Sequence, residues 1–332
     1  MRFWAAELLL ACAFTSAYAA DRLPTYGADV SAFTVSGVSS GGYMAVQMHV
    51  AHSSRVAGVG ALAAGPYYCA QGGLWTASYN CMTPGVWTPL PRADLLKAHA
   101  ERFAREKRID PTSNLARARV WLFSGTRDST VEPEVVEALA GFYALFKAKF
   151  VLVKDKPAGH AMVTENAGNA CDATKAPFIN DCDYDAAGEL LRHLLGSLAP
   201  AVPKPAGRLL AFDQREFGDV YAISMADAGY AYVPQACDKQ PCKVHVAFHG
   251  CRQGVEAVGE RFVRDAGYNR WADANRLIVL YPQVIARYAW WTWNPRGCWD
   301  WWGYTGQRYA TKEAPQIRAV LAMIERLGER RK

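Results

Sequence analysis

The sequence lacks the features that mark several large classes of protein. Its basic residues are scattered, so the net charge of +6 forms no concentrated stripe of the kind that binds nucleic acid. Beyond the first twenty residues, no uninterrupted apolar run is long enough for a membrane-spanning helix. With 51% hydrophobic residues among 332, the chain has the composition of a globular protein with a large core. We therefore expect no nucleic-acid partner and no transmembrane segment.

The cysteines do not indicate a metal centre. The chain has no CxxC pair and no histidine at ligand spacing, so we expect no metal and no other cofactor. Of nine cysteines, Cys12 lies near the N-terminus, and the eight that remain are an even number, as is typical of disulfide-bonded exported proteins. Pairing of neighbours along the chain predicts four bridges, which are Cys69–Cys81, Cys171–Cys182, Cys237–Cys242 and Cys251–Cys298.

Residues 1–19 have the pattern of a secretory signal peptide. Arg2 precedes a short apolar stretch, and Ala17-Tyr18-Ala19 is a small-x-small cleavage site. We expect cleavage near Ala19, a mature chain of residues 20–332, and a secreted or periplasmic location. The alternative is a lipoprotein site at which Cys12 becomes the lipidated first residue.

Apolar segments alternate with helical patterns along most of the chain. This alternation predicts an α/β fold with a parallel sheet and crossover helices. A proline-rich stretch at 199–207 is the only obvious joint. The expected strands are 32–35, 56–63, 120–123, 150–153, 244–248 and 277–281, those at 56–63, 120–123 and 150–153 being buried, and the expected helices are 92–106, 133–146, 185–198, 262–275 and 315–327.

A glycine-rich turn between a predicted strand and a helical pattern carries the first catalytic candidate. Gly37-Val38-Ser39-Ser40-Gly41 has the form GxSxG. Glycines allow the tight turn, because a side chain there would clash, and the turn lifts the Ser39 hydroxyl clear of the sheet. The motif alone is often an ordinary Gly/Ser turn, but the strand before it and the helix after it favour a nucleophile.

A serine hydroxyl is a poor nucleophile at neutral pH, so it needs a base and a carboxylate that orients the base. After such a turn the acid and then the base follow along the chain. Asp128 follows the strand at 120–123 and His160 the strand at 150–153, at the sheet edge where α/β sites form. Asp155 competes with Asp128 but shares the His160 loop. Each residue alone has an ordinary structural explanation, whereas the correct order on successive strand ends favours a catalytic triad.

The tetrahedral intermediate also needs backbone N–H groups for its oxyanion. The residue after the nucleophile, here Ser40, supplies one of them. The second normally comes from a loop after an earlier strand, often marked by His-Gly. His249-Gly250 follows the strand at 244–248, but it lies far beyond Ser39 in the chain. The two parts of the site therefore occur in reversed order.

Several motifs carry a family resemblance. The turn His249-Gly250-Cys251-Arg252-Gln253, the strand 277–282 and the segment Cys298-Trp299-Asp300-Trp301-Trp302-Gly303 resemble, in that order, the N-terminal half of secreted polyhydroxybutyrate depolymerases and related esterases. The turns at 37–42, 125–128 and 159–160 resemble the half that usually comes second. The resemblance covers nearly all of the mature chain. It implies a circularly permuted α/β-hydrolase fold, with a mostly parallel sheet flanked by helices, in one catalytic domain whose permutation joint lies near 199–207.

The resemblance also implies a role for individual residues. Ser39 is the nucleophile, Asp128 the acid and His160 the base. The amides of Ser40 and Cys251 form the oxyanion hole.

Six tryptophans gather between residues 288 and 304. So dense a cluster is unusual for the core alone, because each indole N–H needs a partner when buried. By resemblance we expect Trp302, with Trp301 and His249, to contact the substrate, and Trp299 to lie in the core. A clustered apolar surface would also let the protein adsorb on a polymer.

The predicted function is that of a serine esterase which hydrolyses polyhydroxyalkanoate, either poly(3-hydroxybutyrate) or its oligomers, through an acyl-enzyme. The alternative enzyme is another carboxylesterase of the same scaffold, such as a feruloyl or acetylxylan esterase or an oxidised polyvinyl alcohol hydrolase, since fold and triad do not fix the substrate. A second class is a non-catalytic polymer-binding protein. The expected partner is a polyester or oligoester substrate, and we expect a monomer.

Overall fold

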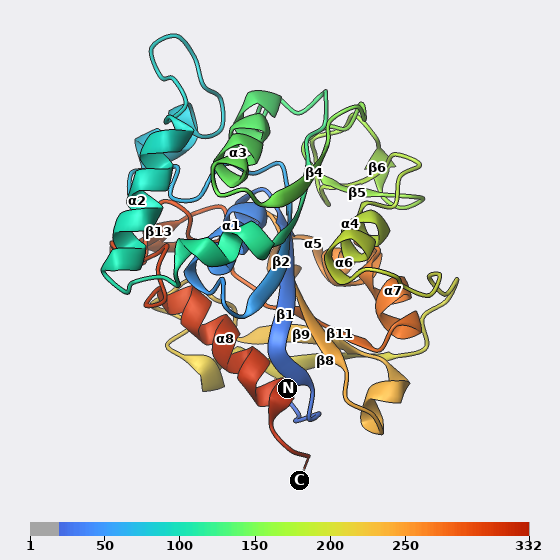
Figure 1. Cartoon of the computed structure of the whole chain (residues 1–332). Coiled ribbons are helices and arrows are strands. Elements are labelled where there is room, and N and C mark those ends of the chain that lie inside the picture. Colours follow the sequence, from blue (N-terminus) through green and yellow to red (C-terminus); the bar gives the residue numbers. More distant parts are fainter. Residues whose placement is uncertain (1–19, 332) are drawn as a thin grey trace, which may run out of the picture.

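The computed structural model describes residues 20–331, so the predicted signal peptide and Cys12 lie outside the described residues. The molecule is built on an eight-stranded sheet with the order β4-β3-β2-β1-β10-β11-β9-β8 (Figure 1). Its strands are β1 Asp29–Val38, β2 Val56–Leu62, β3 Arg119–Phe123, β4 Lys149–Val153, β8 Arg208–Asp213, β9 Ala228–Val233, β10 Lys243–Phe248 and β11 Leu277–Tyr281.

The sheet joins the two halves of the chain. β1 pairs in parallel with β2 on one side and with β10 on the other, so a strand from the first half lies directly beside a strand from the second. β9 runs antiparallel to its neighbours β11 and β8, whereas the remaining pairs are parallel. The mostly parallel sheet and the reversed order of the halves confirm the predicted permuted α/β-hydrolase fold.

Helices cover both faces of the sheet (Figure 1). α1 Ser40–Ala51, α2 Ala93–Arg105, α3 Pro133–Leu145 and α8 Pro315–Gly328 pack on one face, and α4 Ala186–Leu195, α6 Arg261–Asp265 and α7 Tyr268–Ala274 pack on the other. β11 explains why both faces are covered: Ile278 and Leu280 enter one core, while Val279 and Tyr281 enter the other. Strands that are apolar on both faces must be buried on both.

Short elements complete the fold at the ends of the sheet. They are the helical turns η1 Thr76–Asn80, η2 Thr112–Arg117, η3 Gln214–Phe217, η4 Gln235–Asp238 and α5 Val255–Val258, a small sheet of β5 Met162–Thr164, β6 Asn169–Ala170 and β7 Ile179–Asp181, and the hairpin of β12 Arg287–Ala289 and β13 Thr292–Asn294.

Three expectations about the elements need correction. The strand expected to be buried at 150–153 is the edge strand β4, whose first three residues are exposed. The single helix expected at 262–275 is two helices, α6 and α7, because Gly267 between them adopts a left-handed φ of 90°. The strands β8 and β9 were not expected; β8 is an edge strand in which only Phe212 is buried, and β9 contains Gly229, a residue depleted in strands.

The proline-rich joint at 199–207 is held against α7 and its C-terminal end. The Asn275 side chain accepts a hydrogen bond from the amide of Ala199 at 2.7 Å and donates one to its carbonyl at 3.0 Å. The Asp273 carboxylate accepts from the amide of Ala206 at 3.0 Å. The connection between the halves is therefore a fixed segment.

All four predicted cysteine pairs are disulfides in the structure, namely Cys69–Cys81, Cys171–Cys182, Cys237–Cys242 and Cys251–Cys298. In the part of the chain from residue 20 to 331, no helix has the length and apolar character needed to cross a bilayer.

Candidate active site

Ser39 occupies the sharp turn between β1 and α1. Its φ of 57° is uncommon for a residue other than glycine. The backbone passes so close to itself here that a Cβ on Gly37 would lie 2.3 Å from the carbonyl oxygen of Gly41. The structure thus contains the strained turn that the sequence predicted, at the C-terminal end of a central strand.

Asp128 and His160 form a hydrogen-bonded pair beyond the ends of β3 and β4. His160 Nδ1 lies 2.8 Å from Asp128 Oδ2. The other carboxylate oxygen of Asp128 accepts from the amides of Thr130 at 2.8 Å and Val131 at 2.9 Å. A carboxylate can only accept, so Nδ1 carries the imidazole proton and leaves Nε2 free to take another.

Ser39 and His160 line one cavity of about 440 Å³. In the described chain no hydrogen bond joins the two side chains; such contacts often tighten only when substrate binds. The walls of the cavity are largely apolar, and they include Leu74, Met82, Phe178, Trp293, Trp301 and Trp302.

The end of β10 packs directly on the Ser39 turn. A Cβ on Gly41 would lie 2.4 Å from the carbonyl oxygens of both Phe248 and His249. A Cβ on Gly250 would lie 3.3 Å from Cβ of Ser39. Glycine is required at Gly41 because two backbones meet there, and this contact brings the His-Gly turn of the second half to the serine of the first.

Among residues 20–331, two backbone amides near Ser39 have no hydrogen-bond partner. Ser40 is the first residue of α1, where an N–H has no carbonyl one turn earlier in the helix. Cys251 follows Gly250 and lines the cavity. Neither amide makes a backbone hydrogen bond within residues 20–331. Both are therefore available to an oxygen atom bound beside Ser39.

Comparison with known proteins gives the family. No family model matches the chain. A poly(3-hydroxybutyrate) depolymerase of Delftia acidovorans is 43% identical over 325 residues, which is 96% of this chain and 64% of that protein. A polyhydroxybutyrate depolymerase of Talaromyces funiculosus is 35% identical over 325 residues and is matched over 93% of both chains. This chain belongs to the polyhydroxybutyrate depolymerase family.

Solved structures of depolymerases share its fold. The crystal structure of a PHB depolymerase from Penicillium funiculosum matches with a TM-score of 0.82 and 32% identity, over 93% of this chain and all of that one. A PHB depolymerase in which a serine is replaced by alanine, complexed with an R3HB trimer, matches with the same score, identity and coverage.

His249 does not line the cavity, contrary to our expectation that it contacts substrate. It is fully buried, and burial lowers its pKa to about 4, so the ring is neutral at pH 7. Its Nε2 accepts from the amide of Val284 at 3.2 Å, which leaves the proton on Nδ1 to be donated to the carbonyl of Gly250 at 2.7 Å. Because the C=O and N–H of a trans peptide point in opposite directions, this bond fixes the direction of the Cys251 N–H.

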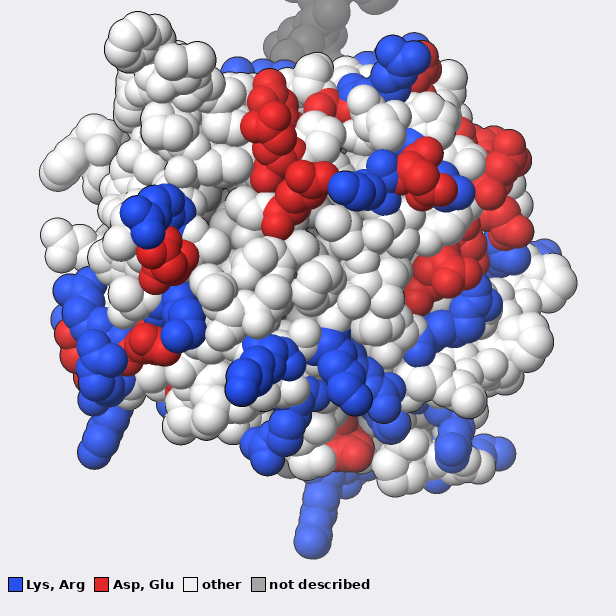
Figure 2. Space-filling model, turned by 45° about the horizontal axis from the view of Figure 1, so that its top comes forward, with Lys and Arg blue, Asp and Glu red and all other residues white. Residues whose placement is uncertain are grey.

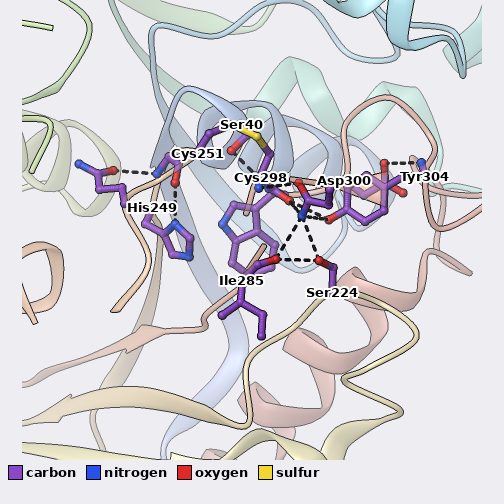
Figure 3. Close-up of a disulfide and its surroundings, with 12 residues drawn as sticks. Ser40, Ser224, His249, Cys251, Ile285, Cys298, Asp300 and Tyr304 are labelled. Atoms are coloured by element: carbon purple, nitrogen blue, oxygen red, sulfur yellow. Dashed lines mark hydrogen bonds between the residues drawn. A yellow bond between two sulfur atoms is a disulfide. The ribbon is translucent and has the colours of Figure 1, made fainter. Parts of the chain in front are cut away.

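Two further contacts hold the same turn. The Gln253 side chain accepts from the amide of Gly250 at 2.7 Å and donates to the carbonyl of Phe178 at 2.7 Å. The Cys251–Cys298 disulfide joins the turn to the tryptophan-rich segment (Figure 3). Gln253 belongs to the family motif, but the motif does not reveal what its side chain binds.

The tryptophan-rich segment is organised by Asp300, which the sequence did not single out. Its buried carboxylate accepts from the amides of Gly303, Tyr304 and Thr305 and from the Thr305 hydroxyl. Figure 3 shows Asp300 beside Tyr304. Burial nevertheless raises the pKa of Asp300. The Gln47 side chain of α1 donates to the Asp300 carbonyl at 2.9 Å, so the segment is tied to the helix that begins beside Ser39.

The tryptophans of this segment lie in two kinds of place, and the core position expected for Trp299 is confirmed. Trp299 is fully buried against Phe248. Trp301 stacks on Tyr43 of α1, with ring centroids 4.0 Å apart, and lines the cavity together with Trp302. Trp301 and Trp302 therefore lie where a substrate could touch them, whereas His249 does not.

Proposed function

We propose that this chain is a serine esterase that hydrolyses poly(3-hydroxybutyrate) or its oligomers. The observation that carries the proposal is the convergence, at one largely apolar cavity, of the Ser39 turn, the His160–Asp128 pair and the Gly250–Cys251 turn. The family relatives are named for the same activity, and a related structure contains an R3HB trimer.

In the proposed mechanism His160 Nε2 takes the proton of the Ser39 hydroxyl as its oxygen attacks the ester carbonyl. The Ser40 and Cys251 amides stabilise the resulting oxyanion, and Asp128 stabilises the imidazolium. The tetrahedral intermediate collapses, and the proton moves to the departing alcohol. Water then repeats the cycle on the acyl-enzyme and releases a carboxylic acid, so that His160 returns to its neutral form.

The surface around the cavity suits an apolar polymer. Two segments that supply cavity residues, 74–87 and 288–293, also carry large exposed aromatic side chains, among them Trp87 at 94% exposure and Trp290 at 88%. We call these two segments the aromatic rim. Figure 2, which brings the top of Figure 1 forward, shows uncharged residues across the middle of that face. Exposed apolar area of this kind would adsorb on a polyester surface.

The proposal extends to location and assembly. Disulfides form and persist in oxidising compartments, and four are present here, which supports a secreted or periplasmic enzyme. The sheet shared by the two halves supports one catalytic domain for residues 20–332. The sequence pattern of residues 1–19 supports a signal peptide. We further propose that the enzyme acts as a monomer, which sedimentation would check.

Replacement of Ser39 by Ala tests the function. Clearing of a poly(3-hydroxybutyrate) suspension should fall at least about ten-thousand-fold, while Tm stays nearly unchanged because only one oxygen is lost. An organophosphonate should label Ser39 in the unmodified enzyme and nothing in the variant. Binding without labelling would instead support a non-catalytic polymer-binding protein, and release from feruloylated or acetylated sugars without clearing would support another esterase.

A further inference from the structure

Two arginines give the cavity a charge that a neutral polyester does not require. Arg252 and Arg296 both line the cavity and are exposed. Among the described residues, no other lysine or arginine, and no aspartate or glutamate, lines the cavity. Within residues 20–331, neither guanidinium has a carboxylate oxygen within 4.0 Å. The cavity therefore presents two unpaired positive charges.

The backbones that carry these arginines are held together. The amide of Arg252 donates to the carbonyl of Arg296 at 2.8 Å. The neighbouring residues Cys251 and Cys298 form a disulfide. The hydrogen bond and the disulfide hold the backbones of the two arginines close together at the edge of the cavity. This reduces the entropy lost when both side chains bind one ligand.

A second, smaller hollow of about 220 Å³ adjoins the cavity at Arg252, Pro295 and Arg296. Both arginines line this hollow as well. Glu256 lies on its wall, but without an ion pair to either arginine in the described chain. A ligand can therefore reach the guanidinium groups from the cavity and still have room beyond them.

We infer that Arg252 and Arg296 bind the free carboxylate end of a hydroxybutyrate oligomer. This inference rests on the proposed function, in which the free carboxylate is the only charged group of the substrate. Arginine is suited to the task because its planar guanidinium can bind a carboxylate through two parallel hydrogen bonds. In an oligomer this carboxylate lies on the side of the departing alcohol, so the pair also sets the direction of the chain across Ser39.

Binding measured in a Ser39→Ala background tests the inference without turnover. We expect the free acid of the 3-hydroxybutyrate trimer to bind about fivefold more tightly than its methyl ester, and added salt to weaken only the acid. The preference should disappear in the Arg252→Gln/Arg296→Gln double variant and survive largely in the Arg252→Lys/Arg296→Lys variant. Arg318→Gln is the matched control, because Arg318 is exposed on α8 and lines neither hollow.

Equal affinity for acid and ester in the Ser39→Ala protein would overturn the inference. A loss of preference in Arg318→Gln as large as in the double glutamine variant would also overturn it, since the effect would then come from net charge alone. These results are distinct from failure of the proposed function, which would appear as absence of hydrolysis of the methyl ester by the enzyme with Ser39 intact.

Discussion

The two halves of the chain contribute to the site in different ways. In the first half, Ser39, Asp128 and His160 each follow the end of a parallel strand, and local turns hold them in place. In the second half, the Gly250–Cys251 turn is held by the side chains of His249 and Gln253 and by a disulfide. The position of the three proposed catalytic groups thus follows from the order of the strands, whereas the position of the second amide depends on buried side chains outside the proposed triad.

Among the changes that test this difference between the halves, replacement of His249 should have the largest effect on catalysis. Replacement by Leu should lower kcat about a hundredfold with little change in KM, because the Gly250–Cys251 peptide loses its anchor and the Cys251 amide loses its direction. Replacement by Gln should restore much of the rate, since an amide can both donate to Gly250 and accept from Val284. The measurement is kcat and KM on a soluble hydroxybutyrate trimer ester.

Thermal unfolding of both His249 variants serves as the control. A purely structural role would lower Tm and affect the Leu and Gln variants alike. Equal rates in the two variants, or a loss confined to KM, would contradict the role assigned to His249.

A second prediction concerns the pairing of β1 with β10, which joins the two halves of the chain. His245 on β10 lies between the hydroxyls of Thr34 and Ser36 on β1, at 2.7 and 2.8 Å. Burial lowers its pKa from 6.5 to about 3. Between these pH values the unfolded chain binds a proton at His245 that the folded chain does not. The free energy of unfolding therefore falls as the pH falls below 6.5. For each such histidine the loss is up to about 1.4 kcal/mol per pH unit.

Urea unfolding between pH 6.5 and 5 measures this effect. Replacement of His245 by Gln should remove up to about 2 kcal/mol of the stability lost over that interval, whatever its effect at pH 6.5. In the His245 variant the free energy of unfolding should still rise with pH, because other buried histidines remain, among them His49. If the His245 variant kept the same dependence of unfolding free energy on pH, folding would not lower the pKa of His245.

The smallest effect is expected from replacing exposed tryptophans outside the cavity. There the two halves of the chain should contribute equally to contact with the polymer. Trp87 and Trp290 belong to opposite segments of the aromatic rim and do not line the cavity. Replacement of either by Ser should lower the ratio of granule hydrolysis to trimer hydrolysis about fivefold, because about 1 kcal/mol or more of apolar contact with the polymer is lost. The exposed Leu145 at the end of α3 provides the control, since its replacement by Ser should leave the ratio unchanged. A change only in the Trp290 variant would mean that one half alone meets the polymer.

Local patterns predicted much of this molecule. The strands of the first half, the GxSxG turn, and the order of Asp128 and His160 were recognisable because each depends on short-range periodicity or turn chemistry. β8 and β9 escaped prediction because β8 lies at the edge of the sheet, where most of its residues stay exposed or half-buried, and β9 contains Gly229, which is depleted in strands. The role of His249 escaped for another reason, since its partner Val284 is distant in the sequence.

The sequence by itself predicted most of the parallel strands and long helices, the serine turn and the four cysteine pairs. Only the tertiary structure decided that β1 lies between β2 and β10, which brings the Gly250–Cys251 turn against Ser39. It also decided that Trp299 is buried while Trp290 is exposed, although both belong to one tryptophan-rich stretch. The reason is physical: the pairing of distant strands and the burial of a side chain depend on contacts between residues far apart in the chain, which local periodicity does not encode.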